Sequence, residues 1–447
     1  MDHKAPGGVG SLDELGGLNS LGGSIALRNL EFLQPAPEKF HLREKPRLRS
    51  LVLQWSRGQQ VDKSERDESI LWDNLWPHPN LTSLRIDSCM SRSPPSWLSS
   101  IKNVVELELG RCGKWKYLPP LGELSSLRRL TLKALDTLVF VQEISDQEQS
   151  STERPFFPSL EVLKLLDCLN LKSWWGRRQQ GGADQDHWQY DSHSTFPKLS
   201  VVEISFCYEL NSLPLFPQIK TLSIFSGVCV KLLEQQVMAL PSYLSEEAVS
   251  ADNPFSKLEH LELDDVVDLQ DSMLETLLPL LGNLRSMRLS HCHNLRSLSH
   301  GMQYLSSLSS LKVEECDELD LSSNDNEHGS QWHSLSKLRD LRILLLPKLV
   351  ALPEGIQHVI TLQSLKLIRC ENLTSLPEWI GNFSSLQELD VSYSSTLTCL
   401  PNGMRRLNSL KKLTIVGCPV LQEGCQRENG ADWEKIAHLP CSIRSTY

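Results

Sequence analysis

A nine-residue stretch, Leu362–Cys370, decides the fold, and it reads Leu-Gln-Ser-Leu-Lys-Leu-Ile-Arg-Cys. Its central alternation, Leu365-Lys366-Leu367, has the period of two that is typical of a short β-strand with one buried face. The framework apolar-x-x-apolar-x-apolar occurs 14 times, and each framework position is apolar although only 40% of the chain is. The copies begin at Leu48, Leu81, Val104, Leu127, Leu160, Leu199, Ile219, Leu258, Leu284, Leu308, Leu338, Leu362, Leu386 and Leu410.

Successive copies lie 20 to 39 residues apart, most often 24. A tight hairpin cannot contain so many residues, so successive strands must run parallel, with the chain returning on the outside. Several strands are followed by a Leu-x-x-Leu-Pro segment such as Leu373–Pro377, where the proline ends a turn. We therefore predict an α/β solenoid: a curved horseshoe with a parallel β-sheet on its concave face and an irregular or short-helical outer face.

This framework resembles that of leucine-rich-repeat proteins, and the resemblance covers nearly the whole chain. We expect a solenoid of about 14 repeats over residues 48–418. Residues 1–47 are expected to hold a degenerate repeat or the remnant of a longer repeat region, because Ile25 and Leu27 fit an earlier strand. Residues 419–447 are expected to form a C-terminal tail or cap, which a repeat stack needs where its last repeat has no neighbour.

The composition argues against several classes of function. The chain has 45 Lys and Arg against 55 Asp and Glu, a formal charge of −10, whereas nucleic-acid binding requires clustered cations. No apolar run approaches the ~18 residues of a membrane span, and the Gly-rich N-terminus does not match a signal peptide. We therefore expect a cytoplasmic or nuclear protein that is not secreted and that binds neither nucleic acid nor membrane.

Eight of the 12 cysteines share one repeat position, three residues after the last framework residue. They are Cys89, Cys112, Cys168, Cys207, Cys292, Cys316, Cys370 and Cys418. In leucine-rich repeats this position usually holds Asn or Cys in an internal ladder, where a free thiol acts as a small buried hydrophobe. We expect a structural ladder of reduced thiols rather than a redox or metal site.

Candidate metal and catalytic motifs are weak. His291, Cys292 and His293 offer three ligands, but neighbouring strand residues point to opposite faces and do not easily converge on one ion. The tail segment Cys425–Cys441 lacks a paired C-x-x-C. There is no G-x-x-x-x-G-K-[ST] phosphate loop, no G-x-S-x-G and no H-E-x-x-H. We expect a protein that is not an enzyme and that holds no metal and no cofactor.

Two groups of motifs outside the framework narrow the family. The first is Leu51–Trp55, Leu75–Leu81 and Leu118–Gly122, and the second is Cys418–Pro419 with Gly430–Pro440. Their order and spacing resemble the repeat region of plant nucleotide-binding leucine-rich-repeat disease-resistance proteins of the coiled-coil class. The resemblance implies a recognition module of innate immunity, whose partner is a pathogen effector, a host protein or the family's own switch domain. The nucleotide-binding residues of that switch domain have no counterpart in this sequence.

Two other functions stay open. The chain could serve as a free-standing leucine-rich-repeat adaptor, such as a substrate receptor for a ubiquitin ligase, although no F-box-like helical segment is visible before Leu48. It could also be a truncated paralogue that does not signal. An enzyme within the insertions is disfavoured, because none is long enough for a catalytic domain.

The residue between the last two framework positions should project from the concave sheet. Four consecutive members of this row are cations, and three further arginines flank them. The row cations are Arg288, Lys312, Arg342 and Lys366, and the flanking residues are Arg285, Arg339 and Arg369. Neighbouring strands lie ~4.8 Å apart, so the four cations would form a stripe about 15 Å long. Two interpretations stay open: a solvated strand face, or an electrostatic docking surface for an acidic partner.

Long intervals between copies mark insertions, which map to rim loops in a solenoid. The insertion over residues 173–194 contains Trp174, Trp175 and Trp188, and aromatic residues of this kind dominate interaction hot spots. Packing against the next repeat is the alternative. A second insertion, over residues 228–253, includes a plausible helix over 230–240, and those at 141–154 and 320–330 are polar.

Overall fold

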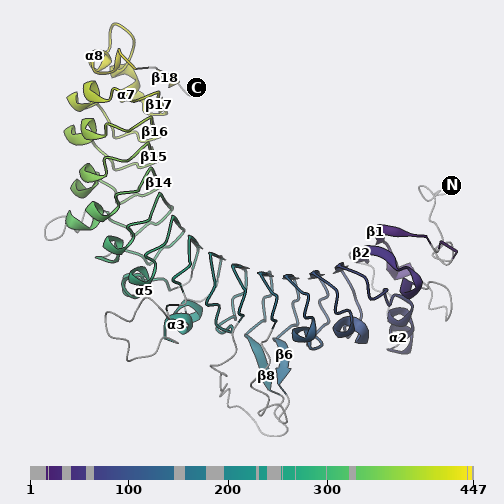
Figure 1. The fold of residues 1–447 in the computed structure, drawn as a ribbon. Helices are drawn as coiled ribbons and strands as arrows, with labels where there is room; N and C mark the ends of the chain where they lie inside the picture. The colour runs from purple at the N-terminus through teal and green to yellow at the C-terminus, as the bar shows by residue number, and fades with distance from the viewer. Residues whose placement is uncertain are drawn as a thin grey trace, which may run out of the picture. The chain divides into compact units, whose positions relative to one another are not determined.

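The computed structural model describes residues 17–18, 20–32, 42–56, 65–144, 157–177, 196–227, 231–238, 253, 255–266, 268–298, 300–321, 329–439 and 441–444. They belong to two compact units, an N-terminal unit (Met1–Phe216) and a C-terminal unit (Pro217–Tyr447). In each unit, parallel strands form one side and the connecting segments return on the other (Figure 1).

The sheet of the N-terminal unit holds one strand for each framework copy, preceded by β1. Its order is β1 (Gly22–Leu27), β2 (Arg47–Gln54), β3 (Ser83–Asp87), β4 (Glu106–Gly110), β5 (Arg129–Lys133), β7 (Val162–Leu166) and β9 (Val201–Ser205). Each strand pairs parallel with the next. Ile25 and Leu27 lie in β1, so the expected early strand is present.

The sheet of the C-terminal unit follows the same rule. Its order is β10 (Thr221–Phe225), β11 (His260–Asp264), β12 (Ser286–Ser290), β13 (Ser310–Glu314), β14 (Asp340–Leu344), β15 (Ser364–Ile368), β16 (Glu388–Ser392), β17 (Lys412–Val416) and β18 (Cys441–Arg444). From β10 to β17 the pairs match residue for residue at equal repeat positions. The predicted leucine-rich-repeat solenoid is confirmed.

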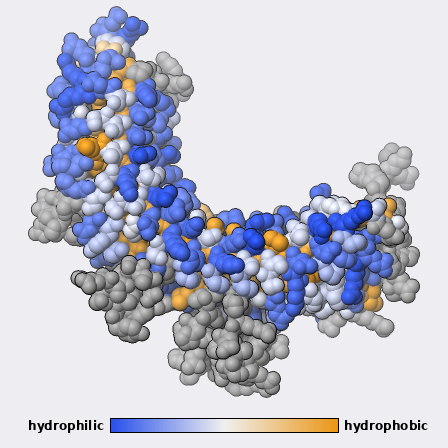
Figure 2. All heavy atoms as spheres, in the orientation of Figure 1, coloured by the Kyte–Doolittle hydropathy of each residue, from blue (hydrophilic) through white to orange (hydrophobic). Residues whose placement is uncertain are grey.

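The framework residues form the core. Leu365 and Leu367 in β15 are fully buried, whereas Lys366 between them points away from the core. Burying one such leucine contributes about 1.5–3 kcal/mol, and no single repeat could enclose its own leucines. Stacking the repeats therefore supplies the core. On the face shown, the surface of the C-terminal unit is mainly polar, with hydrophobic residues in small separate patches (Figure 2).

A left-handed residue follows nearly every strand. In the C-terminal unit, His291, Glu315 and Arg369 have φ of 51°, 51° and 55° at the same repeat position. Left-handed backbone costs a non-glycine residue roughly 1–2 kcal/mol, which packing must offset. The turn sends the next residue inward, and Cys292, Cys316 and Cys370 are accordingly buried.

All eight cysteines of the expected ladder are buried. The thiol of Cys292 lies 3.3 Å from the carbonyl oxygen of Ser290, to which it donates. Its hydrogen bond with Cys316, together with burial, raises the pKa of Cys292, and burial raises the pKa of Cys370 to about 11. Protonated, enclosed thiols of this kind are poor nucleophiles.

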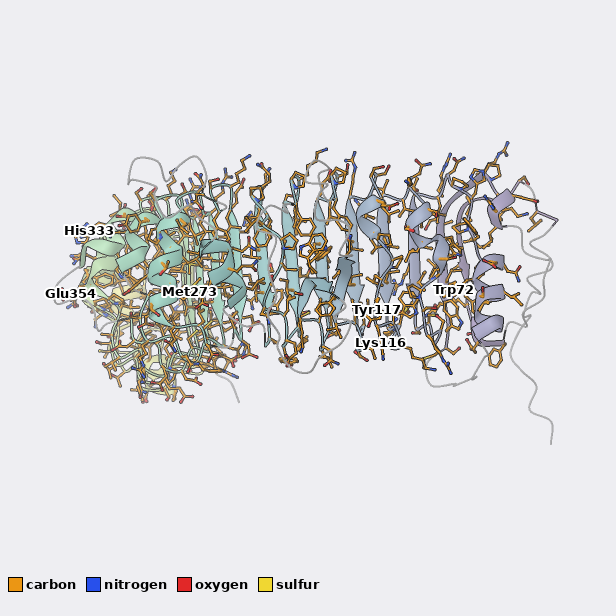
Figure 3. All side chains as sticks on the ribbon, turned by 90° about the horizontal axis from the view of Figure 1, so that it is seen from below. Trp72, Lys116, Tyr117, Met273, His333 and Glu354 are labelled. Atoms are coloured by element: carbon orange, nitrogen blue, oxygen red, sulfur yellow. The ribbon has the colours of Figure 1, made fainter. Side chains whose placement is uncertain are left out.

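Short helical turns form the outer side of the C-terminal unit. They are α3 (Lys231–Met238), α5 (Asp271–Leu277), η6 (Leu278–Leu280), η7 (His300–Tyr304), η8 (Gly329–Ser334), η9 (Glu354–His358), η10 (Glu378–Asn382) and η11 (Asn402–Arg406). Helix α3 lies within the stretch 230–240 for which a helix was expected. Successive turns pack closely: the rings of His333 and His358 stack 3.7 Å apart, and a Cβ on Gly403 would collide with the carbonyl oxygen of Glu378. His333 and Glu354 label two neighbouring turns in Figure 3.

The N-terminal unit has outer elements that the repeat pattern does not predict. Strands β6 (Phe140–Ile144) and β8 (Ser173–Arg177) form a separate parallel pair, drawn away from the main strands in Figure 1. The segment after Trp55 includes helix α2 (Glu65–Asn74). Trp72 of α2 packs edge-on against Trp55 and Trp97, with ring centres 5.6 and 6.2 Å apart. The remaining turns are η1 (Leu30–Phe32), η2 (Leu42–Glu44), η3 (Ser96–Ser100) and η4 (Leu121–Glu123).

The tail packs on the last repeat through α7 (Pro419–Gly424), α8 (Trp433–Ile436) and β18. The side chain of Asp432 is almost fully buried, and it accepts hydrogen bonds from the amide of Leu400 at 2.8 Å and from Lys435 at 2.6 Å. Strand β18 extends the sheet beyond β17. Within the described ranges, no helix is both long and apolar enough to cross a bilayer.

Candidate recognition surface

The four predicted cations do lie side by side on the strand face of the C-terminal unit. The register pairs Arg288 with Lys312, Lys312 with Arg342, and Arg342 with Lys366. Glu262 precedes them on β11, and Asp390 follows them on β16. We call this line of six residues, Glu262 to Asp390, the central row.

Carboxylates accompany the first two cations. Arg288 contacts Glu262 at 2.8 Å and Glu314 at 3.2 Å, and Lys312 contacts the same oxygen of Glu314 at 2.5 Å. Partial burial on its own would raise the pKa of Glu314, but the hydrogen bonds and charges of Lys312 and Arg288 outweigh it and lower that pKa. Glu314 is therefore ionised at neutral pH and bridges two strands.

The other two cations are matched in the same way. The Nε atom of Arg342 lies 2.8 Å from Asp340, and the ammonium of Lys366 lies 3.2 Å from Glu388. Glu388 also accepts a hydrogen bond of 2.7 Å from Lys412. That bond, reinforced by Lys366 and opposed by burial, lowers the pKa of Glu388.

The interpretation of the stripe as a positive surface therefore needs correction. Its four cations contact four carboxylates, from Glu262, Glu314, Asp340 and Glu388. Glu314 and Asp340 stand two residues from Lys312 and Arg342 along their strands, hence on the same face. The sequence does contain this signal, in the repeat positions two residues before and after the row cations. The surface has mixed charge, and its side chains hold one another in place.

A histidine cluster lies where β11 and β12 end. His291 contacts Asp264 through Nδ1 at 2.8 Å and Glu315 through Nε2 at 3.0 Å. Partial burial opposes protonation, but the two carboxylates outweigh it and raise the pKa of His291. Cys292 is buried on the other side of the turn, so the three neighbours do not converge. No group of three or more metal-type ligands occurs in the part of the chain that the structure describes.

The three flanking arginines do not lie together, because they stand at opposite ends of the strands. Arg369 leaves the end of β15, and its guanidinium lies 5.6 Å from the ring centre of the half-exposed Tyr393. Arg285 and Arg339 stand one residue before β12 and β14, at the opposite end of the strands, where they line a hollow. Only Arg369 therefore continues the strand face, and the sequence pattern gave no sign of its aromatic partner.

The tryptophans of the insertion divide as well. Trp174 is completely buried against Phe157 and Phe196, with ring centres 5.6 and 5.0 Å apart. It cannot contact a partner there, so the hot-spot hypothesis is wrong for Trp174. Trp175, the next residue of β8, is half-buried, because successive side chains of a strand point to opposite faces. Trp188 lies outside the described residues.

Two further features lie on the N-terminal unit. A hollow of about 660 Å³ is lined by Arg92, Lys114, Lys116, Tyr117 and four neighbouring residues together with Thr137. Lys116 and Tyr117 are labelled in Figure 3. At the end of β9, the exposed rings of Phe206 and Tyr208 lie 6.5 Å apart. The left-handed position after each strand was the signal that could have identified Phe206 as exposed.

Comparison with known families locates two matches, one in each unit. Residues 12–135 match the family described as R13L1/DRL21 LRRs, and residues 257–380 match plant disease resistance protein RPS2-like leucine-rich repeats. One relative is the putative disease resistance RPP13-like protein 1 of Arabidopsis thaliana, 26% identical over 78% of this chain and 30% of its own length. Another is the putative disease resistance protein RGA1 of Solanum bulbocastanum, 28% identical over 64% of this chain and 25% of its own.

Among solved structures, a leucine-rich-repeat protein of Leptospira interrogans aligns over 97% of both chains with 18% identity and a TM-score of 0.49. With one buried-face strand per repeat and a return path outside, the chain is a leucine-rich-repeat protein. Its repeats resemble the leucine-rich repeats of plant disease resistance proteins, in both of the matched ranges and in the relatives named above. The chain spans about a quarter to a third of the length of the relatives described above.

Proposed function

We propose that the chain is the protein-recognition module of a plant immune receptor and acts by binding rather than by catalysis. Its partner would be a pathogen protein, a host protein or the switch domain of the receptor, bound on the strand face of the C-terminal unit. The central row carries this proposal. Six charged side chains stand in register on consecutive strands, and ion pairs hold the five from Glu262 to Lys366.

A paired surface of this kind favours specificity over affinity. Mixed charges in fixed places suit a partner with the complementary pattern and repel one with like charges opposite them. Since the side chains already contact one another, binding would cost little further side-chain entropy. Regulation would follow from competition: a foreign protein and an internal domain that bind the same face exclude each other, which shifts a population of states.

The direct test replaces two members of the central row, Lys312→Glu and Arg342→Glu, in the full chain expressed in plant tissue. Affinity capture followed by mass spectrometry should show loss of the partners that the unchanged chain retains. Arg427→Glu is the matched control, because Arg427 is an exposed tail cation far from the row in sequence. Identical captured proteins for the double variant and for the control would contradict the proposal.

A second measurement addresses the partner class. An antibody against residues 425–447 would be used to blot native tissue. A product much larger than 50.6 kDa would direct the search toward a switch domain within the same receptor. A product of that mass would favour a stand-alone adaptor or a paralogue that does not signal.

A further inference from the structure

A shallow hollow of about 680 Å³ lies at the edge of the C-terminal unit where the chain enters its strands. Two repeat positions supply nearly all of its lining, one residue and three residues before each strand from β10 to β14. The first position gives Lys220, Glu259, Arg285, Ser309 and Arg339, and the second gives Lys257, Asn283, Ser307 and Lys337, with Ser256 beside them. We call this surface the edge hollow.

The charges of the edge hollow are not balanced. Five cations line it against one carboxylate, Glu259, which lies 3.5 Å from Arg285. Lys257 donates a hydrogen bond to the side-chain oxygen of Gln218, which is neutral. Within the described ranges, Lys220, Lys337 and Arg339 have no ion pair. Among the described residues, four of these positive charges therefore have no paired carboxylate, on a chain whose formal net charge is −10.

The floor of the edge hollow is polar and already hydrogen-bonded. The hydroxyl of Ser309 donates to the carbonyl of Arg285 at 2.8 Å, and the amide of Asn283 donates to the carbonyl of Ser256 at 2.7 Å. These bonds tie neighbouring repeats together and hold the cation-bearing backbone in place. The volume falls in the range of about 300–1,000 Å³ that is usual for sites which enclose a ligand segment.

The cations are spread along a line rather than converged on a point. Lys220, Arg285 and Arg339 stand at one repeat position on every second strand, so at ~4.8 Å per strand they are about 10 Å apart. An extended peptide advances ~3.3 Å per residue, so acidic residues two to four positions apart reach from one cation to the next. A single phosphate group is too small to contact two of them.

We propose that the edge hollow binds an acidic peptide segment of a protein partner, with carboxylates that meet Lys220, Arg285 and Arg339. This inference rests on the proposed function, since it names the chemistry of one part of the partner. The segment would contact the chain beside the central row, not on it. The edge hollow would supply electrostatic attraction, and the central row would supply selection between partners.

The test uses the full chain and a fluorescent eight-residue peptide of alternating Asp and Ser, with an Asn-for-Asp peptide as the neutral reference. Fluorescence anisotropy measures both affinities at low salt and at physiological salt. We expect binding of the Asp peptide alone, weakening as salt increases. The double variant Arg285→Gln with Arg339→Gln should bind it about tenfold more weakly, which corresponds to the loss of two charge contacts of about 0.7 kcal/mol each.

The matched control removes two cations that are each paired with a carboxylate and belong to neither surface, Arg405→Gln with Arg427→Gln, and should change peptide affinity less than about twofold. Equal weakening in both double variants, or none in the first, would overturn the inference. Displacement of the peptide by tripolyphosphate at lower concentration than by unlabelled peptide would reassign the hollow to phosphates. Circular dichroism melting verifies that each variant is folded.

The two proposals fail separately. Loss of peptide binding in the Arg285 and Arg339 variant, with partner capture by the central row unaffected, supports the edge hollow and leaves the recognition face in place. Normal peptide binding with unchanged partner capture in the Lys312→Glu and Arg342→Glu chain contradicts the proposed function alone.

Discussion

The central row and the edge hollow arise from the same repeats, and both are rich in Lys and Arg, yet their charge environments differ. Each cation of the central row lies within 3.2 Å of a carboxylate. In the edge hollow, serine and asparagine take the places beside the cations. The electrostatic field over a repeat surface is therefore set by several neighbouring repeat positions together. The charges at one repeat position alone do not determine it.

The largest expected effect is on the core that supports both surfaces. Leu311 is fully buried in β13 and lies along the chain between Ser309 of the edge hollow and Lys312 of the central row. Leu311→Ala should lower the free energy of unfolding by about 2–5 kcal/mol, because it removes buried methylene groups and leaves a cavity. Chemical denaturation followed by circular dichroism measures it. Ser309→Ala, at the hollow, is the control and should cost much less; similar losses would mean that β13 does not belong to a packed core.

The second prediction concerns a variant in which the cations of the central row lose carboxylate partners, as in the edge hollow. Glu314→Gln with Glu388→Gln removes carboxylates that contact three of its cations, Arg288, Lys312 and Lys366. In a chain that already carries Arg285→Gln and Arg339→Gln, the acidic peptide should bind about three- to tenfold more tightly after this change, at about 0.5 kcal/mol or more per exposed charge. Anisotropy at low salt measures the gain. If affinity did not change, pairing would not be what separates the two surfaces.

A third prediction concerns acid. The pKa values of Glu314 and Glu388 are lowered by their cationic partners, so each lies below the value of the unfolded chain. The stability that these carboxylates contribute is fully present above their ordinary value of 4.5 and is lost as the pH falls through the lower folded value. Between pH 7 and pH 3, the denaturation midpoint of the unchanged chain should therefore fall further than that of the Glu314→Gln, Glu388→Gln chain. Parallel curves would contradict this.

The smallest expected effect is a difference in the free energy of unfolding between two Arg→Gln variants. The two arginines differ in the charges that surround them. Arg342→Gln removes a cation paired with Asp340 on a half-exposed surface and should lower the free energy of unfolding by no more than about 1 kcal/mol. Arg339→Gln removes a cation from a like-charged group and should leave stability unchanged or raise it by a few tenths of a kcal/mol. Paired denaturation curves resolve the sign. A larger loss for Arg339 than for Arg342 would reverse the comparison.

The repeat framework predicted the sheet because its leucines, such as Leu365 and Leu367, can be buried only when parallel strands stack on one another. It also located the four cations of the central row, since register follows from the same positions. It did not predict their partners, because Glu314 reaches Arg288 across 26 residues of chain. Whether side chains from two strands meet depends on the residues at adjacent repeat positions. The residues at a single repeat position do not give that information.

Elements outside the framework were harder to predict. Strands β6 and β8 pair with each other rather than with the main sheet, and neither carries the three-leucine framework. Trp174 was a hot-spot candidate because aromatic residues dominate such sites, but strand alternation places its ring against Phe157 and Phe196. The boundaries expected at residues 47 and 418 stay predictions, and the division at Phe216 had no counterpart in the sequence pattern.

At the left-handed turn after each strand, the backbone conformation is the same from repeat to repeat while the type of side chain varies. In the C-terminal unit that position holds Ser226, Asp265, His291, Glu315, Leu345, Arg369, Tyr393 and Gly417, with φ between 37° and 67° throughout. Acidic, basic, aromatic and aliphatic side chains all occupy it, but no β-branched residue does, as the sterics of this conformation require. A gene could therefore exchange one residue per repeat and present a new surface without redesigning the backbone that displays it. For directed evolution, these turns are the sites at which a substitution should cost the fold the least stability.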